Sequence, residues 1–183
     1  DILGNFVNRT LTFVNKNFDS KIPEAGELDA LDQKMLTRIR KTPNRVGNFL
    51  ENFEVRKALT NLMDLARFAN KYFNDQTPWS TIRENPEKCK TTLNICCRVC
   101  KSLAILMQPF LPFSAEKLWS ILNQEGVVSD CHWDDAAEAD FPPGFTINST
   151  AILFEKIEDD QIQPEIDKLK NIIAKRSTED QPE

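Results

Sequence analysis

The sequence predicts an all-α fold: an antiparallel helical bundle of about five helices, with an irregular segment and a C-terminal helix. Three features lead to this class. Apolar residues recur every three or four positions along several long stretches. Short breaks that contain proline separate these stretches, and only 5 of the 183 residues are glycine. Helices joined by short loops pack as antiparallel neighbours, and a chain of this length, with 40% hydrophobic residues, can bury one core.

The first helical stretch covers residues 1–19. Polar residues lie on the face opposite its apolar stripe, and among them Asn5 and Arg9 are four positions apart, so their side chains meet on one side of the helix. No capping residue precedes Asp1, so we expect this helix to continue from a longer chain. The stripe itself follows a three-and-four spacing, with Leu3, Phe6, Thr10, Phe13 and Asn17.

The second stretch, residues 28–41, is the most basic part of the chain. We expect Pro43 to interrupt it, because proline lacks the backbone N–H that a helix interior uses. A short piece over residues 44–51 then follows. The cations of this region are Lys34, Arg38, Arg40, Lys41 and Arg45.

Three further helices are predicted over residues 54–76, 86–110 and 113–124. The first is the clearest, with an apolar stripe at 4-3-4-3-4 spacing: Val55, Leu59, Leu62, Ala66, Ala69 and Phe73. The second begins with Asn85 as cap and Pro86 in the first helical position. Its stripe has the same spacing and contains three cysteines: Cys89, Leu93, Cys96, Cys100, Leu103 and Met107.

The character of the sequence changes after Gly126. We therefore divide the chain into a helical bundle over residues 1–125, an irregular acidic connecting segment over 126–160, a C-terminal helix over 161–176 and a disordered tail over 177–183. The last helix carries an apolar stripe of Ile162, Ile166, Leu169 and Ile173.

Charge is distributed unevenly along the chain. The formal net charge is −5, but residues 1–126 carry +4 and residues 127–183 carry −9. The basic segment suits an anionic partner better than the total suggests. No apolar run approaches the roughly 20 residues of a membrane span, so we expect no membrane partner. Five cysteines cannot all pair, which favours a reducing compartment, and we expect a cytoplasmic location.

The cysteines raise the question of a metal site. Cys97 and Cys100 form a CxxC pair that Cys131 and His132 could complete as zinc ligands. Helix packing explains the spacing without a metal, because cysteines in a helical stripe behave as small hydrophobes. The sequence also shows no catalytic motif and no glycine-rich phosphate loop. We therefore expect neither a metal, nor a catalytic residue, nor a cofactor within this chain, and we expect its activity to be binding.

The stretch "NDQTPW", residues 74–79, raises the question of what its tryptophan does. Pro78 should hold Thr77 in an extended conformation and end the helix, so that Trp79 is presented at least partly exposed. An unstacked nucleotide base needs an aromatic plane and polar partners on its edge. Trp79 could supply the plane, and Asn5 with Arg9 the partners. Residue types alone favour a simpler interpretation, in which the two polar residues are merely solvated and the tryptophan fills the core.

Four segments resemble one protein family. "NFVNRTLTFVNKNF" (5–18) is similar to the first helix of the anticodon-binding domain of methionyl-tRNA synthetases, and "ANKYFNDQTPW" (69–79) to that domain's signature ending in proline and tryptophan. "ILMQPFLPFSAEKLWSILN" (105–123) and "LFEKIEDDQI" (153–162) resemble later parts of the domain. The resemblance covers nearly the whole chain.

The resemblance implies a function and a set of site residues. It implies that Asn5, Arg9 and Trp79 bind the anticodon CAU of methionine tRNA, with the first base stacked on the tryptophan that Pro78 positions. It also implies a parent methionine–tRNA ligase, whose separate catalytic domain uses ATP and magnesium, so that this part alone should be inactive. Two other interpretations stay open: a helical protein-interaction module, and the anticodon-binding domain of another class I synthetase.

Overall fold

The computed structural model describes residues 2–155 and 157–179. The chain divides into two units, Asp1–Leu153 and Phe154–Glu183. The first unit is a helical bundle, and an isolated bridge between Lys21 and Thr146 is the only β pairing among the described residues. The predicted all-α class is therefore confirmed. The bundle consists of α1 (Ile2–Asn17), α2 (Ala30–Glu51), α3 (Val55–Gln76), α4 (Pro78–Glu84), α5 (Pro86–Met107) and α6 (Pro112–Ile121).

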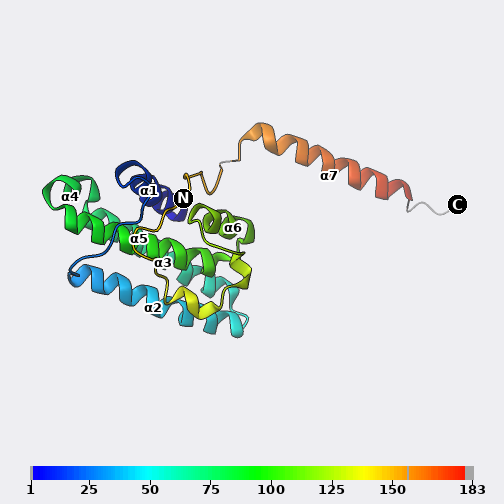
Figure 1. The fold of residues 1–183 in the computed structure, drawn as a ribbon. Coiled ribbons are helices and arrows are strands. Elements are labelled where there is room, and N and C mark those ends of the chain that lie inside the picture. Colours follow the sequence, from blue (N-terminus) through cyan, green and yellow to red (C-terminus); the bar gives the residue numbers. More distant parts are fainter. Residues whose placement is uncertain (1, 156, 180–183) are drawn as a thin grey trace. The chain divides into compact units, whose positions relative to one another are not determined.

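Helix α5 is the centre of this unit. It packs against α1, α2, α3, α4 and α6, and Figure 1 shows α4 and α6 at its two ends. Because it is covered on all sides, α5 is buried over most of its circumference. Asn85 caps it as expected, and its side chain accepts a hydrogen bond from the backbone N–H of Lys88 at 3.2 Å.

The cysteine stripe of α5 lies in the core, as predicted. Cys89, Cys96 and Cys100 are fully buried, and Cys97 is buried beside them. Burial raises the pKa of the Cys97 thiol to about 12 and holds the pKa values of Cys96 and Cys100 well above their usual range. These thiols stay protonated and pack as small apolar groups.

The expected break at Pro43 is wrong, because α2 continues through it. Tertiary contacts hold the helix at this point. The indole N–H of Trp133 donates to the Pro43 carbonyl at 2.8 Å, and a Cβ added to Gly47 would lie 3.0 Å from the same nitrogen. Any larger residue at position 47 would crowd the Trp133 ring. Because position 47 is glycine, the ring can cover α2 near Pro43, where the helix lacks one backbone hydrogen bond.

The apolar stripe predicted for α3 is partly wrong. Val55 and Leu59 at its beginning are exposed, whereas Leu62, Ala66 and Phe73 are buried. The buried face also takes in Ala58, Leu65, Tyr72 and Gln76. The buried surface differs from the predicted stripe because α3 packs against α2 on one side and α1 on another. A single helix face cannot contact both neighbours.

The segment after α6 is irregular, with two short 3₁₀ turns at Val128–Asp130 and Trp133–Ala136. It lies on the bundle: the second turn packs against α2 and α5. Side chains spaced along the segment enter the core, namely Val128, Ala136, Ala139, Phe141, Ile147 and Leu153. The segment therefore belongs to the same compact unit as the helices.

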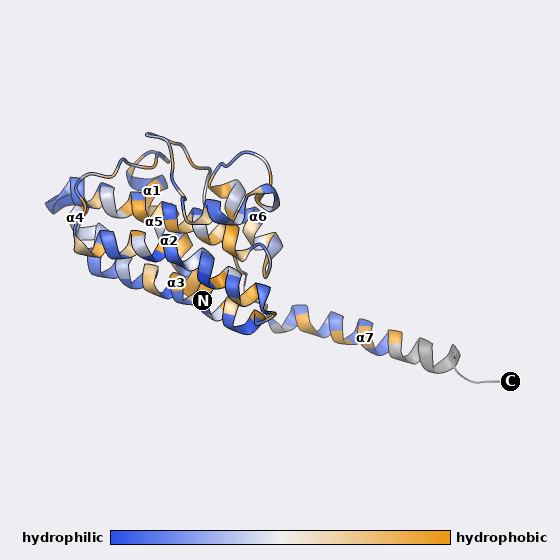
Figure 2. Ribbon diagram, turned by 90° about the horizontal axis from the view of Figure 1, so that it is seen from below, coloured by the Kyte–Doolittle hydropathy of each residue, from blue (hydrophilic) through white to orange (hydrophobic). Residues whose placement is uncertain are grey.

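The second unit contains α7 (Asp159–Glu179), which extends three residues beyond the predicted helix end at 176. Residues 180–183 of the expected tail and the side chain of Ile173 lie outside the described part of the chain. Figure 2 shows hydrophobic and hydrophilic residues alternating along α7. Across the described residues, no helix combines the length and apolar character that crossing a membrane requires.

Candidate nucleic-acid interface

Helix α1 places the two polar residues singled out in the sequence. Leu3, Phe6 and Val7 face the core, and this fixes the opposite face toward solvent. Asn5 is exposed and Arg9 is half-buried on that face. Arg9 is held by α3: its Nη1 donates to Asn70 Oδ1 at 3.3 Å, and its Nη2 donates to Asn74 Oδ1 at 2.9 Å.

The guanidinium of Arg9 also lies against two aromatic rings. Its Cζ is 4.6 Å from the ring centroid of Phe73 and 5.7 Å from that of Trp79. Both distances are within the range of a cation–π interaction. The structure thus brings Arg9 and Trp79 together, as the sequence suggested. No described residue forms a hydrogen bond with the side chain of Asn5, which lies one turn before Arg9 on α1.

A tight corner between α3 and α4 presents Trp79. Thr77 ends α3 and begins α4, and its carbonyl accepts from the backbone N–H groups of Ser80 and Thr81 at 2.9 and 3.0 Å. The expected extended conformation of Thr77 is wrong: its φ is 43° and its ψ is 58°, in the left-handed region. This conformation is strained for a β-branched residue, and it joins α3 to α4 through a single residue.

Trp79 occupies the second position of α4, a helix that the sequence did not predict. Its side chain is 48% exposed, which confirms the expectation of partial exposure. One part of the ring rests on Phe73, with centroids 6.1 Å apart and planes inclined by 44°. The buried thiol of Cys89 donates to the Pro78 carbonyl at 3.6 Å, and this contact ties the corner to α5.

A buried network fixes the last turn of α3 beneath this corner. Asp32 of α2 is fully buried and accepts a hydrogen bond from the Tyr72 hydroxyl at 2.6 Å. Gln76 donates to the same carboxylate at 3.3 Å, and Lys88 of α5 pairs with it at 2.6 Å. Lys88 also pairs with Asp29 at 2.7 Å. Three helices therefore meet at one satisfied carboxylate.

Two pKa values in the network reflect these contacts. Partial burial opposes ionisation of Asp29, but the hydrogen bonds from Lys88, the Asp32 backbone and Gln76 outweigh it and hold the Asp29 pKa well below its usual range. Burial, followed by nearby Cys96 and the hydrogen bond to Asp32, raises the Tyr72 pKa well above its usual range. Asp29 is thus stabilised as an anion, and Tyr72 as a neutral donor.

Sequence reasoning missed Asn70, Asn74 and the Asp32 network. Asn70 and Asn74 are four positions apart beside Phe73, which is the spacing of a polar pair on one helix face, so a signal was present. Nothing in the sequence pattern linked Asp32 to Tyr72, because 40 residues separate them. Cys97 and Cys100 are buried, and no group of three or more metal-ligating side chains gathers among the described residues.

Comparisons with known proteins bear on this site. A family model described as the anticodon binding domain of methionyl tRNA ligase matches residues 22–171. The chain belongs to this family. The methionine–tRNA ligase of Pyrococcus furiosus is 44% identical over 162 residues, which cover 88% of this chain. That of Methanosphaera stadtmanae is 39% identical over 183 residues, covering 94% of this chain.

Solved structures of methionyl-tRNA synthetases have a similar fold over this part of the chain. The apo form of Mycobacterium tuberculosis methionyl-tRNA synthetase matches with a TM-score of 0.80 and 28% identity, over 86% of this chain and 32% of that one. This anticodon-binding domain spans 22% of the length of the Pyrococcus ligase and 27% of the Methanosphaera ligase. Membership in this family favours the anticodon-binding domain of a methionyl-tRNA ligase over the two other interpretations, a helical protein-interaction module and the domain of another class I synthetase.

Proposed function

We propose that this chain recognises the CAU anticodon of methionine tRNA as part of a methionine–tRNA ligase. The observation that carries the proposal is the fixed position of the Arg9 guanidinium beside the half-exposed ring of Trp79. A base that stacks on the exposed part of Trp79 would present its edge to the Arg9 donors. Stacking of this kind accepts any base, so the choice of base rests on hydrogen bonds.

Arg9 has the donors that a cytosine needs. A guanidinium offers five N–H donors, and the bonds to Asn70 and Asn74 use two of them. The others can reach the N3 and O2 acceptors of a stacked cytosine, whereas uracil carries a hydrogen on N3 and would leave a donor unpaired. An unpaired donor costs about 1–3 kcal/mol. Because the asparagines and the rings already hold Arg9, little side-chain freedom is lost on binding.

The other residues of the site have supporting roles in the proposal. Asn5 is exposed and offers both a donor and an acceptor, so it can bridge to the bound base from the same face of α1. Pro78 is buried and sets the direction in which Trp79 leaves the corner. The carbonyl bond from Cys89 holds the proline in place.

The remaining part of the proposed parent enzyme would do the chemistry. We place the binding of methionine, ATP and magnesium in a catalytic domain outside this chain, which would be the partner of this domain in the full ligase. The chain alone is then expected not to aminoacylate tRNA. We also expect the parent ligase to act in the cytoplasm, as a part of translation there.

The test is a direct titration of the 183-residue chain with methionine tRNA and with the same tRNA carrying UAU. The cytosine form should bind about 5- to 150-fold tighter, which is the factor that one unpaired donor produces. Equal affinities would contradict the proposal. A third tRNA with CAC tests whether the discrimination extends beyond the first base.

A further inference from the structure

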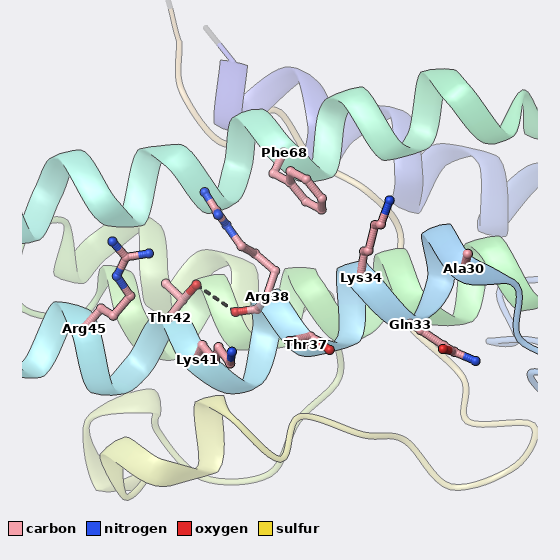
Figure 3. A pocket seen from close by; sticks show the side chains of 9 residues that line it. All are labelled: Ala30, Gln33, Lys34, Thr37, Arg38, Lys41, Thr42, Arg45 and Phe68. Carbon is pink, nitrogen blue, oxygen red and sulfur yellow. Dashed lines mark hydrogen bonds between the residues drawn. The ribbon is translucent and has the colours of Figure 1, made fainter.

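A cationic groove lies on the other side of α3 from Arg9. It has a volume of about 700 Å³ and runs between α2 and α3. Figure 3 shows Lys34, Arg38 and Arg45 reaching from α2 toward α3, with Phe68 of α3 beside them. Lys41 also lines the groove, and no carboxylate does. The guanidinium of Arg38 lies 5.2 Å from the Phe68 ring centroid.

The cations of this groove have no acidic partner among the described residues. Two cations on the outer face of α3 are paired by contrast: Arg67 contacts Asp64 at 2.7 Å, and Lys71 contacts Asp75 at 2.9 Å. The four groove cations follow one another at intervals of four, three and four residues, which places them along one side of α2. A row of unpaired like charges repels itself, so it is best stabilised by an external anion.

The row begins at the corner that presents Trp79. Asp32, two residues before Lys34, is bonded to Tyr72 and Gln76 in the last turn of α3. Arg38 meets Phe68, more than one turn earlier in α3. The two helices are therefore antiparallel here, and the row from Lys34 to Arg45 extends away from the corner for about 16 Å.

We propose that this groove, formed by Lys34, Arg38, Lys41, Arg45 and Phe68, binds the phosphate backbone of the tRNA whose anticodon contacts Trp79. The inference rests on the proposed function for its ligand. A row of about 16 Å can follow several consecutive phosphates. Phe68 holds Arg38 at the groove, and the flexible lysines need no fixed geometry, because phosphate contacts position a nucleic acid without reading its sequence.

The charge and the length of the row favour RNA over an acidic protein segment. Phosphates repeat at a regular interval along a strand, and the groove cations repeat at a regular interval along a helix. One end of the row also lies near the corner that presents Trp79, because Asp32 is bonded to Tyr72 and Gln76 there. Acidic side chains of a protein would have to match both features by chance.

The experiment compares two variants with the same charge change. The test variant is K34Q/K41Q, which removes two exposed lysines of the groove. The control is K21Q/K117Q, which removes two exposed lysines outside it. Affinity of the 183-residue chain for methionine tRNA is measured by titration from low to moderate salt. Circular dichroism melting confirms that both variants fold.

The test variant should bind about 20- to 60-fold more weakly near 0.1 M salt. The slope of log K against log salt should become shallower by roughly 1.4–1.8, because each lost phosphate contact removes about 0.7–0.9. The preference for CAU over UAU should not change. A test variant that behaves like the control would overturn the groove assignment and leave an acidic protein segment as its occupant.

The two proposals can fail separately. If wild-type chain shows no preference for CAU but K34Q/K41Q still lowers the salt slope, the groove binds RNA and the anticodon assignment is wrong. If the preference is present and the slope is the same in both variants, the anticodon assignment stands and the groove assignment is wrong.

Discussion

Cationic side chains lie on both flanks of helix α3, with Arg9 of α1 on one flank and the groove cations of α2 on the other. The two sets differ in the contacts that fix them in place. On the α1 side, two amide oxygens and two aromatic rings fix Arg9. On the α2 side, Lys34, Lys41 and Arg45 contact no acidic group among the described residues, and only Arg38 rests on a ring. Asn70 and Phe68 are two positions apart, so they point to nearly opposite sides of the same helix.

The difference between the flanks matches two kinds of contact with RNA. Reading a base requires donors at fixed positions, since a mobile donor can adjust to the wrong base as well as the right one. Contacting phosphates requires charge in roughly the right place, and flexible side chains supply it. In our proposals the residues on the α1 flank recognise the base, and the residues on the α2 flank bind the phosphate backbone.

The largest expected effect comes from Asp32, because it supports both flanks. Asp32→Ala would leave Lys88 and the buried Tyr72 hydroxyl without their partner. Breaking a buried pair in this way costs about 3–5 kcal/mol. For a unit of this size, the melting temperature should fall by roughly 10 °C or more. Both CAU preference and salt slope should weaken at temperatures where the variant begins to unfold.

Asp64→Ala is the matched control for this variant. It removes a carboxylate from the exposed pair with Arg67, and such pairs contribute about 0–1 kcal/mol. Its melting temperature should stay within a few degrees of wild type. If Asp32→Ala melts equally close to wild type, the buried network does not support the end of α3.

The fold was predictable where one helix meets the core along one stripe. The cysteine stripe of α5 is an example, since its spacing alone placed Cys89, Cys96 and Cys100 in the interior. Prediction was wrong where a distant segment decides the outcome. Trp133 holds the chain at Pro43 from 90 residues away, and the segment that carries it has no periodicity to reveal where it packs.

The partial exposure of Trp79 could be predicted from the sequence, but the contacts that support the candidate site could not. Local features named Trp79 and Arg9 as candidates, namely an aromatic residue after proline and a polar helix face, and only the family resemblance assigned them a binding role. The Arg9–Asn74 contact joins residues 65 positions apart. The left-handed conformation of Thr77 was missed because a residue before proline usually has an extended backbone. Here Thr77 is also the residue at which α4 begins, and this sets its conformation.

Removing Trp79 should weaken base binding on the α1 flank and leave the cationic groove on the α2 flank unaffected. Trp79→Ala should weaken binding of a CAU stem-loop by about 1–3 kcal/mol, or roughly 5- to 150-fold. The ring is 48% exposed, so its loss should change the free energy of unfolding much less than the loss of a core tryptophan, which costs about 3–5 kcal/mol. Titration and melting of the same sample check both. Low stability with intact affinity would mean that Trp79 is a packing residue.

Changing Arg9 should affect selectivity more than affinity. Arg9→Ala removes the donors that distinguish cytosine from uracil, so the ratio of CAU to UAU affinity should fall toward one, a change of about 1–3 kcal/mol. Arg9→Lys should restore little of it, since an ammonium lacks the planar fork that bonds both asparagines. Arg67→Ala, on the outer face of α3, should leave the ratio unchanged. An equal loss of affinity for both tRNAs would show that Arg9 contacts phosphate.

The smallest effect concerns Asp29 and depends on pH. Its pKa is lowered in the folded chain, so the folded state binds fewer protons than the unfolded state across that interval, and stability rises with pH there. The contribution of Asp29 is complete above its ordinary pKa of about 4 and is lost as the pH falls from there toward the lowered value.

Asp29→Asn removes the charge, yet asparagine caps a helix as well as aspartate does, so α2 keeps its cap. Because the carboxylate is half-exposed, the deficit at pH 7 should stay below about 1 kcal/mol. Melting curves of the variant and of wild type should therefore lie a few degrees apart at pH 7 and approach each other at pH 3. A separation that is the same at both values would mean that the ionised carboxylate contributes nothing to holding Lys88, and that Asp32 alone anchors the corner.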